Sequence, residues 1–175
     1  MPRIPIRVIP DPVLRQKAQP VSAVDKRLAQ FMDDMLESMY LGHGIGLAAN
    51  QVGALERVIT VDISEERNGS KALLMANPEV IWHDPKETFT YNEGCLSIPE
   101  QYADVTRPKR IRVNYLDRAG KKQELEAEDL LSQCIQHEID HLNGVLFIDH
   151  LSALKRSMIT RKVEKAQKQR DEHLL

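Results

Sequence analysis

The amino-acid sequence predicts an α+β fold in which short, mostly antiparallel β-sheets surround a central helix and a further helix ends the chain. Apolar residues recur at helical spacing between residues 24 and 41. Alternating apolar residues at Ile111, Val113 and Tyr115 indicate a strand, and a turn at 117–120 leads into a second strand. The order helix, several short strands, helix, helix is typical of α+β proteins rather than of doubly wound sheets.

The first half of the chain is divided by prolines and glycines. A short helix is expected at residues 11–16, between prolines. The helix at 24–41 is expected to begin at an N-cap formed by Ser22 and to end at Gly42. Residues 42–46 are rich in glycine and are expected to be irregular. Strands are expected at 57–63, 73–75, 79–82, 88–91, 111–116 and 123–127.

Two helices are expected in the second half. The first covers residues 128–143, and Gly144 is well placed to end it. The second carries one apolar stripe, formed by Leu151, Leu154, Met158 and Val163. Residues 151–175 contain seven Lys or Arg against three Asp or Glu, so this helix has a basic surface. We expect residues 1–175 to form a single catalytic domain that includes this basic C-terminal helix.

Composition restricts the class of protein. With 175 residues, of which 42% are hydrophobic, the chain suits one globular domain. A net charge of −2 argues against the whole chain being a nucleic-acid binder. No apolar run is long enough for a membrane span, and the first residues do not resemble a signal peptide. We expect a cytoplasmic, monomeric protein whose two cysteines form no disulfide framework.

The strongest chemical signal is His137-Glu138-Ile139-Asp140-His141. Residues four apart lie on one helix face, so His137 and His141 can bind a single metal ion. Glu138 points about 100° away from His137, from which it can reach a water on the ion as a general base. Arg107 and Asp140 have two interpretations: they pair and support this helix, or they are solvated at the surface. The sequence therefore predicts a hydrolytic metal site on the central helix.

The identity of the third ligand is open on this evidence. In one peptidase pattern, H-E-x-x-H-x-x-G-x-x-H, Gly144 matches the glycine but Phe147 occupies the position of the last histidine. His150 lies three residues too late and is one candidate. Cys95 is the other, because it lies in a polar, glycine-containing stretch. Cys134 is interpreted as a buried structural cysteine.

Three segments of the chain are Gly44-Ile45-Gly46-Leu47-Ala48-Ala49-Asn50-Gln51, Glu93-Gly94-Cys95-Leu96-Ser97 and Gln136-His137-Glu138-Ile139-Asp140-His141. Together they resemble the motifs of the peptide deformylase family. Their order and separations are those of the family, and the resemblance covers nearly the whole chain. It implies a hydrolase that removes the formyl group from the N-terminal formylmethionine of nascent polypeptides and releases formate.

The resemblance also implies the site residues. Cys95, His137 and His141 would bind one divalent metal ion, with Fe²⁺ expected and Zn²⁺, Ni²⁺ or Co²⁺ possible in the same place. Glu138 would be the general base and acid that lets hydroxide on the ion attack the formyl carbon. The Gln51 amide and the Leu96 N–H would form the oxyanion hole.

The substrate would lie beside two backbone segments. The resemblance implies that the peptide pairs as an added strand along Gly44, Ile45 and Gly46 and along the stretch that contains Tyr91, Glu93 and Gly94. Leu130 and Cys134 are candidate walls of an apolar pocket for the methionine side chain. His43, Tyr91 and Gln133 depart from residues common in the family.

Two other functions are compatible with parts of the sequence. A zinc peptidase would cleave internal bonds and give Cys95 no role. A ribosome-associated module without catalysis would not need Glu138 or Gln51. The basic face of the C-terminal helix has two interpretations: contact with ribosomal RNA, which the family resemblance implies, or a solvated helix face.

Overall fold

A five-stranded antiparallel sheet forms the larger layer of the molecule. The computed structural model describes residues 4–174. The sheet has the order β1-β2-β3-β6-β7. Its strands are β1 (Gly46–Ala48), β2 (Val58–Val61), β3 (Leu73–His83), β6 (Arg110–Leu116) and β7 (Lys122–Glu128). The helical segments are η1 (Pro12–Arg15), α1 (Lys26–Leu41), η2 (Ala49–Val52), α2 (Asp129–Leu142), η3 (Phe147–His150) and α3 (Ala153–His173).

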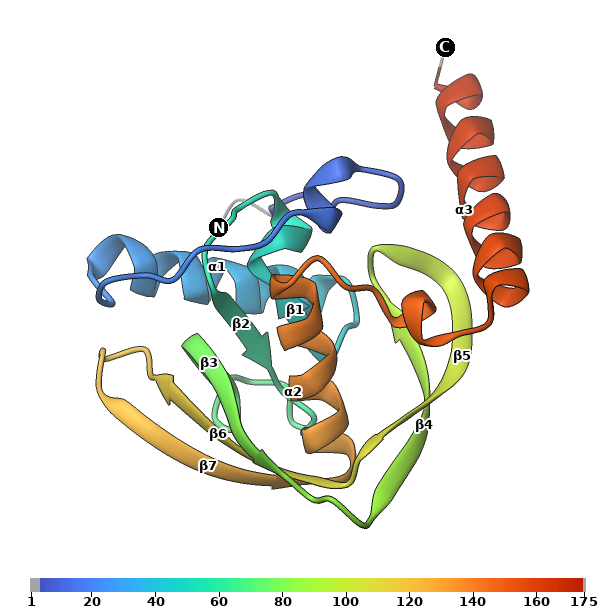
Figure 1. Ribbon diagram of the computed structural model, residues 1–175. Helices are drawn as coiled ribbons and strands as arrows, with labels where there is room; N and C mark the ends of the chain where they lie inside the picture. The colour runs from blue at the N-terminus through green and yellow to red at the C-terminus, as the bar shows by residue number, and fades with distance from the viewer. Residues whose placement is uncertain (1–3, 175) are drawn as a thin grey trace.

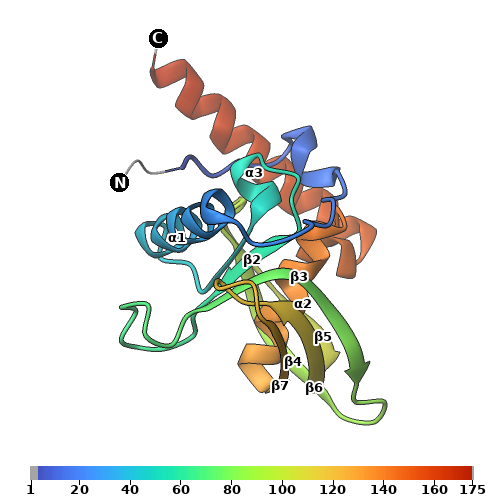
Figure 2. The same cartoon turned by 90° about the vertical axis from the view of Figure 1, so that its left-hand side faces the viewer.

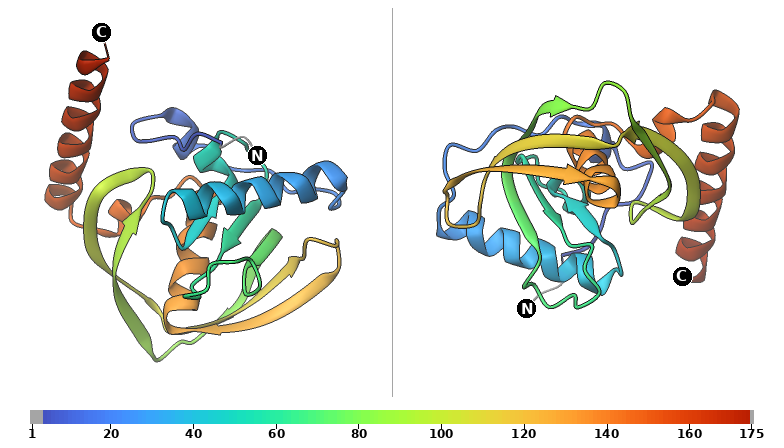
Figure 3. Two further views of the ribbon diagram at one scale, coloured as in Figure 1. Left: turned by 180° about the vertical axis from the view of Figure 1, so that it is seen from behind. Right: turned by 90° about the horizontal axis from the view of Figure 1, so that it is seen from below.

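Helices α1 and α2 cover opposite sides of β1 and β2 (Figures 1 and 3). Val58 packs with the methionines of α1, whereas Ile59 and Val61 pack with Ile135 of α2. Both faces of β2 are therefore covered, and all four of its residues are buried. A strand buried on both faces has no polar alternation, which is why it reads as an apolar run.

The predicted helix at 24–41 is confirmed, but its N-cap is not Ser22. The helix begins at Lys26, and Asp25 accepts a hydrogen bond from the Leu28 N–H at 2.8 Å. Gly42 ends the helix as predicted. Gly144 follows α2 with a left-handed φ of 74°, and an added Cβ there would lie 2.5 Å from the Arg15 carbonyl oxygen.

The strands predicted at 73–75 and 79–82 are parts of one strand, β3. Asn77 lies between them with a positive φ of 48°, and the register with β6 shifts at this point. The Asn77 amide is held by the backbone N–H and carbonyl of Val21. This bulge interrupts the two-residue period of β3, so its pattern indicates two short strands instead of one long strand.

A second sheet, β4 (Thr88–Cys95) and β5 (Ile98–Pro108), stands on the other side of α2 (Figure 1). Strand β4 extends four residues beyond the predicted end at residue 91, and β5 was not predicted. Pro99 and Pro108 argue against a central strand, but within residues 4–174 β5 pairs with β4 alone, so its free edge tolerates proline. Strand β4 thereby places Glu93, Gly94 and Cys95 beside α2.

Helix α3 projects from the body (Figure 2) and contacts β5 and η3. Of the apolar stripe, Val163 is buried, whereas Leu154 and Met158 are 71% and 50% exposed, and Leu151 precedes the helix. The seven basic residues of the helix are all exposed. Within residues 4–174, none of the helices combines the length and the apolar composition that crossing a bilayer requires.

Candidate active site

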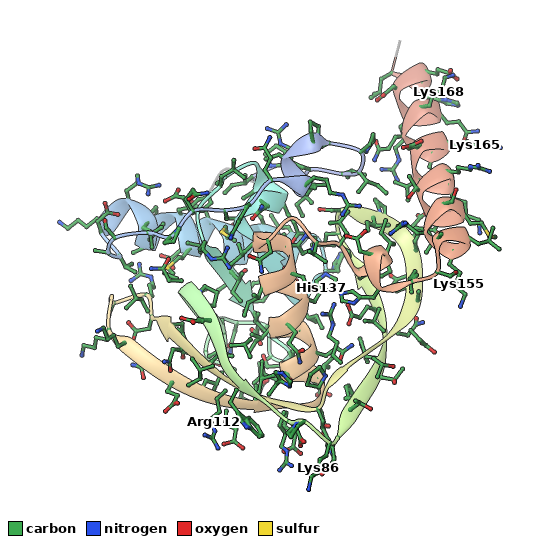
Figure 4. All side chains as sticks on the ribbon, viewed as in Figure 1. Lys86, Arg112, His137, Lys155, Lys165 and Lys168 are labelled. Carbon is green, nitrogen blue, oxygen red and sulfur yellow. The ribbon has the colours of Figure 1, made fainter. Side chains whose placement is uncertain are left out.

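Cys95, His137 and His141 meet between α2 and the β4–β5 sheet. Their ligand atoms all lie within 4.8 Å of one another. The two histidines are one turn apart on α2, and Cys95 reaches them from the end of β4, where a register shift follows Gly94. The Cys95 Sγ lies 3.3 Å from His141 Nε2. Figure 4 labels His137 on the side of α2 that faces this sheet.

This donor set fits a divalent transition metal. One thiol sulfur and two imidazole nitrogens are ligands that Zn²⁺ and Fe²⁺ accept, and three protein ligands leave a coordination position for substrate or water. His150, the other candidate for third ligand, is absent from this cluster. Its Nε2 instead lies 2.9 Å from Asp140 Oδ2. Among the described residues, the His141 Nδ1 atom has no hydrogen-bond partner.

A buried ion-pair network contacts the Nδ1 atom of His137. The His137 Nδ1 lies 2.7 Å from Glu93 Oε1, and Arg107 donates to both oxygens of Glu93 at 2.7 and 3.0 Å. Burial alone would raise the pKa of Glu93, but the hydrogen bonds from His137 and Arg107 outweigh it and lower the pKa to about 2. Glu93 therefore stays ionised and fixes the orientation of the His137 ring.

The predicted pairing of Arg107 with Asp140 is confirmed, because Arg107 Nη1 donates to Asp140 Oδ2 at 2.8 Å. Arg107 of β5 thus contacts α2 through Asp140 and β4 through Glu93. Its side chain is only 5% exposed, so the guanidinium depends on these partners. Sequence reasoning missed its contact with Glu93, which connects two different strands.

Glu138 lies beside the three-residue cluster with its carboxylate buried. Its Oε1 is 3.9 Å from His137 Nε2, and its Oε2 has no hydrogen-bond partner among residues 4–174. Burial raises the pKa of Glu138 to about 7, a shift that the charge of His137 opposes and that of Glu93 reinforces. A carboxyl group with such a pKa can take up or release a proton near neutral pH.

Gln51 presents its amide nitrogen to the same centre. Its Oε1 accepts from the Ala48 N–H at 2.9 Å, so the Nε2 is left to donate to Cys95 Sγ at 3.4 Å and to Ser97 Oγ at 3.1 Å. The Leu96 N–H makes no intramolecular hydrogen bond within the described part of the chain. Both predicted oxyanion-hole groups are thus hydrogen-bond donors beside Cys95.

Gly46 has a steric reason to be glycine. An added Cβ would lie 2.6 Å from Glu138 Oε1 and 2.8 Å from Cys134 Sγ. Strand β1 therefore runs directly against the helix that carries the histidines. Cys134 is buried and donates to the Ile45 carbonyl at 3.5 Å, and burial raises its thiol pKa, which agrees with a structural cysteine.

One cavity of about 400 Å³ collects the predicted site residues. All of these residues line the cavity except His141, whose side chain is completely buried outside the lining. The cavity also has a wall that sequence reasoning did not place there, Tyr102. Tyr102 pairs with Gly94 across the sheet, and its ring occupies the space that a Cβ on Gly94 would need. Only knowledge of β5 could have indicated Tyr102.

Comparison with known proteins agrees with this geometry. The sequence model of the family described as polypeptide deformylase matches residues 4–157. A peptide deformylase of Methylocella silvestris is 54% identical over 171 residues, which cover 96% of this chain and 87% of that protein. A peptide deformylase of Nitrosococcus oceani is 54% identical over 159 residues, covering 91% and 93% of the two chains.

Solved structures show the same fold. The crystal structure of peptide deformylase from Ehrlichia chaffeensis has a TM-score of 0.90 at 35% identity and covers 96% of this chain and 98% of that one. A peptide deformylase from Legionella pneumophila has a TM-score of 0.88 at 40% identity, covering 95% and 96%. The predicted α+β fold is confirmed, and the chain belongs to the polypeptide deformylase family.

Proposed function

We propose that this chain removes the formyl group from the N-terminal formylmethionine of nascent polypeptides and releases formate. Membership of the family and the convergence of Cys95, His137 and His141 support this proposal. The activity would reside in residues 1–175 as one catalytic domain. The observation that carries the proposal is a metal-type ligand cluster with a buried carboxyl group, Glu138, beside it at a cavity of about 400 Å³.

The metal ion would be held by Cys95, His137 and His141. When bound, a divalent ion supplies the positive charge that acidifies water and stabilises negative charge in hydrolysis. We propose Fe²⁺ as the natural ion, with Zn²⁺, Ni²⁺ or Co²⁺ able to replace it, because all accept one thiolate and two imidazoles. Glu93 and Arg107 would keep the His137 ring in place during the reaction.

Glu138 would act as the proton carrier. Its carboxylate would take a proton from the attacking water and return it to the amine that leaves as the new N-terminus. The Gln51 Nε2 and the Leu96 N–H would donate hydrogen bonds to the oxygen on which negative charge develops. Gln51 is suited to this role because the Ala48 N–H fixes the orientation of its amide.

The substrate peptide would lie between the two backbone segments of the cavity. Gly44, Ile45 and Gly46 line the cavity, as do Tyr91, Glu93 and Gly94 of β4. Leu130 and Cys134 would contact the methionine side chain. Formyl is the smallest acyl group, so a tight cavity would exclude acetylated peptides by overlap.

We expect the purified protein to release formate from formyl-Met-Ala-Ser and to release no acetate from acetyl-Met-Ala-Ser. Removal of the ion with a chelator should abolish formate release, and anaerobic addition of Fe²⁺ should restore it, because the ion supplies the essential charge. Formate is measured with a coupled dehydrogenase, and bound metal by elemental analysis. Cleavage of internal bonds in unformylated peptides, without formate release, would instead support a peptidase.

We further propose that α3 contacts ribosomal RNA. Its basic side chains are exposed and lie on a helix that projects from the body (Figure 4). They are Lys155, Arg156, Arg161, Lys162, Lys165, Lys168 and Arg170. Cosedimentation with ribosomes should be strong at low salt and should weaken at moderate salt, as expected for phosphate contacts. A chain truncated after Ser152 that sediments equally well would contradict this proposal.

A further inference from the structure

Arg67 binds the backbone of a segment that lines the cavity, but does not line the cavity itself. Its Nη2 donates to the Gly44 carbonyl oxygen at 2.6 Å, although Arg67 itself lies in the loop between β2 and β3. Gly44 and Ile45 line the cavity, whereas Arg67 is absent from its lining. A charge-assisted hydrogen bond of this length is among the stronger contacts that a backbone carbonyl can make.

The bond determines which way the peptide group between Gly44 and Ile45 faces. In a trans peptide the C=O and the following N–H point in opposite directions. Because the Gly44 C=O is directed to Arg67, outside the lining, the Ile45 N–H is directed to the cavity side. Among residues 4–174 the Ile45 N–H makes no hydrogen bond, while the Ile45 carbonyl is satisfied by the Asp62 N–H at 2.9 Å.

Arg67 is itself fixed by a small network at the C-terminal end of α1. Its guanidinium carbon lies 5.0 Å from the centre of the Tyr40 ring, a cation–π contact. The Tyr40 hydroxyl donates to Asp62 and accepts from the Gly69 N–H at 3.1 Å. Asp62 also accepts from the Ser64 hydroxyl. The network anchors the loop, so the position of the guanidinium is set before any substrate arrives.

We propose that Arg67 is a positioning residue for the substrate, because it orients the Gly44–Ile45 peptide so that the Ile45 N–H can donate to a carbonyl oxygen of the bound peptide. This inference rests on the proposed deformylase function. It assigns Arg67 to substrate binding and not to the chemical step, since it contacts neither Glu138 nor the metal-type cluster. Loss of the guanidinium leaves that peptide group free to rotate, and the binding energy of one backbone hydrogen bond is lost.

The test compares Arg67→Ala with Arg67→Lys and with Lys71→Ala in the zinc-loaded protein. Lys71 lies in the same loop, but its ammonium is exposed and pairs only with Glu66 among the described residues. For formyl-Met-Ala-Ser we expect Arg67→Ala to raise KM roughly fivefold to tenfold with kcat within about twofold of wild type. Arg67→Lys keeps a donor and should recover most of the loss, and Lys71→Ala should behave as wild type.

A second measurement does not depend on turnover. In ¹⁵N-labelled zinc-loaded protein, titration with the product peptide Met-Ala-Ser should shift the Ile45 amide resonance in wild type and in Lys71→Ala, but not in Arg67→Ala. An equal shift in Arg67→Ala, an unchanged KM, or a fall in kcat alone would overturn the inference. If the wild type releases no formate, the proposed function fails, and the titration still reports on Arg67 separately.

Discussion

Replacing Glu138 with glutamine is expected to lower kcat/KM for formate release about a thousandfold, the middle of the range for losing a general acid–base. Glutamine keeps the shape of the side chain but cannot accept and return a proton. Metal content should stay at the wild-type level, because the three ligand residues are unchanged. Steady-state kinetics with formyl-Met-Ala-Ser and elemental analysis of the same preparation measure both quantities.

Glu124→Gln is the matched control for this substitution. Glu124 is exposed on β7, away from the cavity, so the same change of chemistry there should leave kcat/KM unaltered. If Glu138→Gln kept activity within about tenfold of wild type with the same metal content, a role as proton carrier would be untenable.

Glu138→Gln should also change the thermal stability of the metal-free protein. The pKa of Glu138 is raised from 4.5 to about 7 by burial, so the folded state favours the protonated form. A carboxyl group whose folded pKa is raised stabilises the fold at low pH and loses this contribution as the pH rises through the folded pKa. The thermal midpoint of Glu138→Gln should therefore rise relative to that of wild type between pH 4.5 and about 7.

Replacing Arg107 with methionine is expected to cost about 3–5 kcal/mol of unfolding free energy, the range for breaking a buried ion pair by removing one partner. Methionine fills similar space but leaves the ionised Glu93 buried without its bidentate donor. The pKa of Glu93 should rise from about 2, because the guanidinium no longer offsets the burial. Urea unfolding of chelator-treated protein at pH 7 measures the free energy.

Two further variants isolate the cause. Arg112 is an exposed arginine (Figure 4) that lies 3.7 Å from Glu126 and over the Trp82 ring, so Arg112→Met should cost less than about 1 kcal/mol. Adding Glu93→Gln to Arg107→Met should recover part of the loss, since the unpaired charge is removed. An Arg107→Met protein as stable as Arg112→Met would show that the buried pair contributes little.

Arg107→Met should also weaken metal binding. Glu93 orients the His137 ring, and loss of such a supporting contact typically costs 10- to 100-fold in metal affinity. A competition assay with a coloured zinc chelator measures this affinity. Unchanged affinity would mean that the helix alone keeps His137 in place.

Local patterns were sufficient for the elements whose neighbours lie close in the chain. The spacing of Leu28, Met32, Met35 and Met39 predicts α1, because a helix buries residues three and four apart on one face. The four-residue spacing of His137 and His141 likewise predicts that both rings share a side of α2. Strand β5 was missed, because its prolines are tolerated at the free edge of a two-stranded sheet and its polar side chains alternate onto an exposed face.

Site residues that are far apart in the sequence meet through tertiary packing, which no local sequence pattern encodes. Cys95 reaches the histidines only because the β4–β5 sheet stands beside α2, and motif resemblance, not periodicity, indicated it beforehand. The contact of Arg107 with Glu93 and that of Arg67 with Gly44 join strands and loops distant in the chain. Spacing along the chain specifies which side chains share one face of a helix, whereas burial of the two sheets against α2 specifies which faces meet.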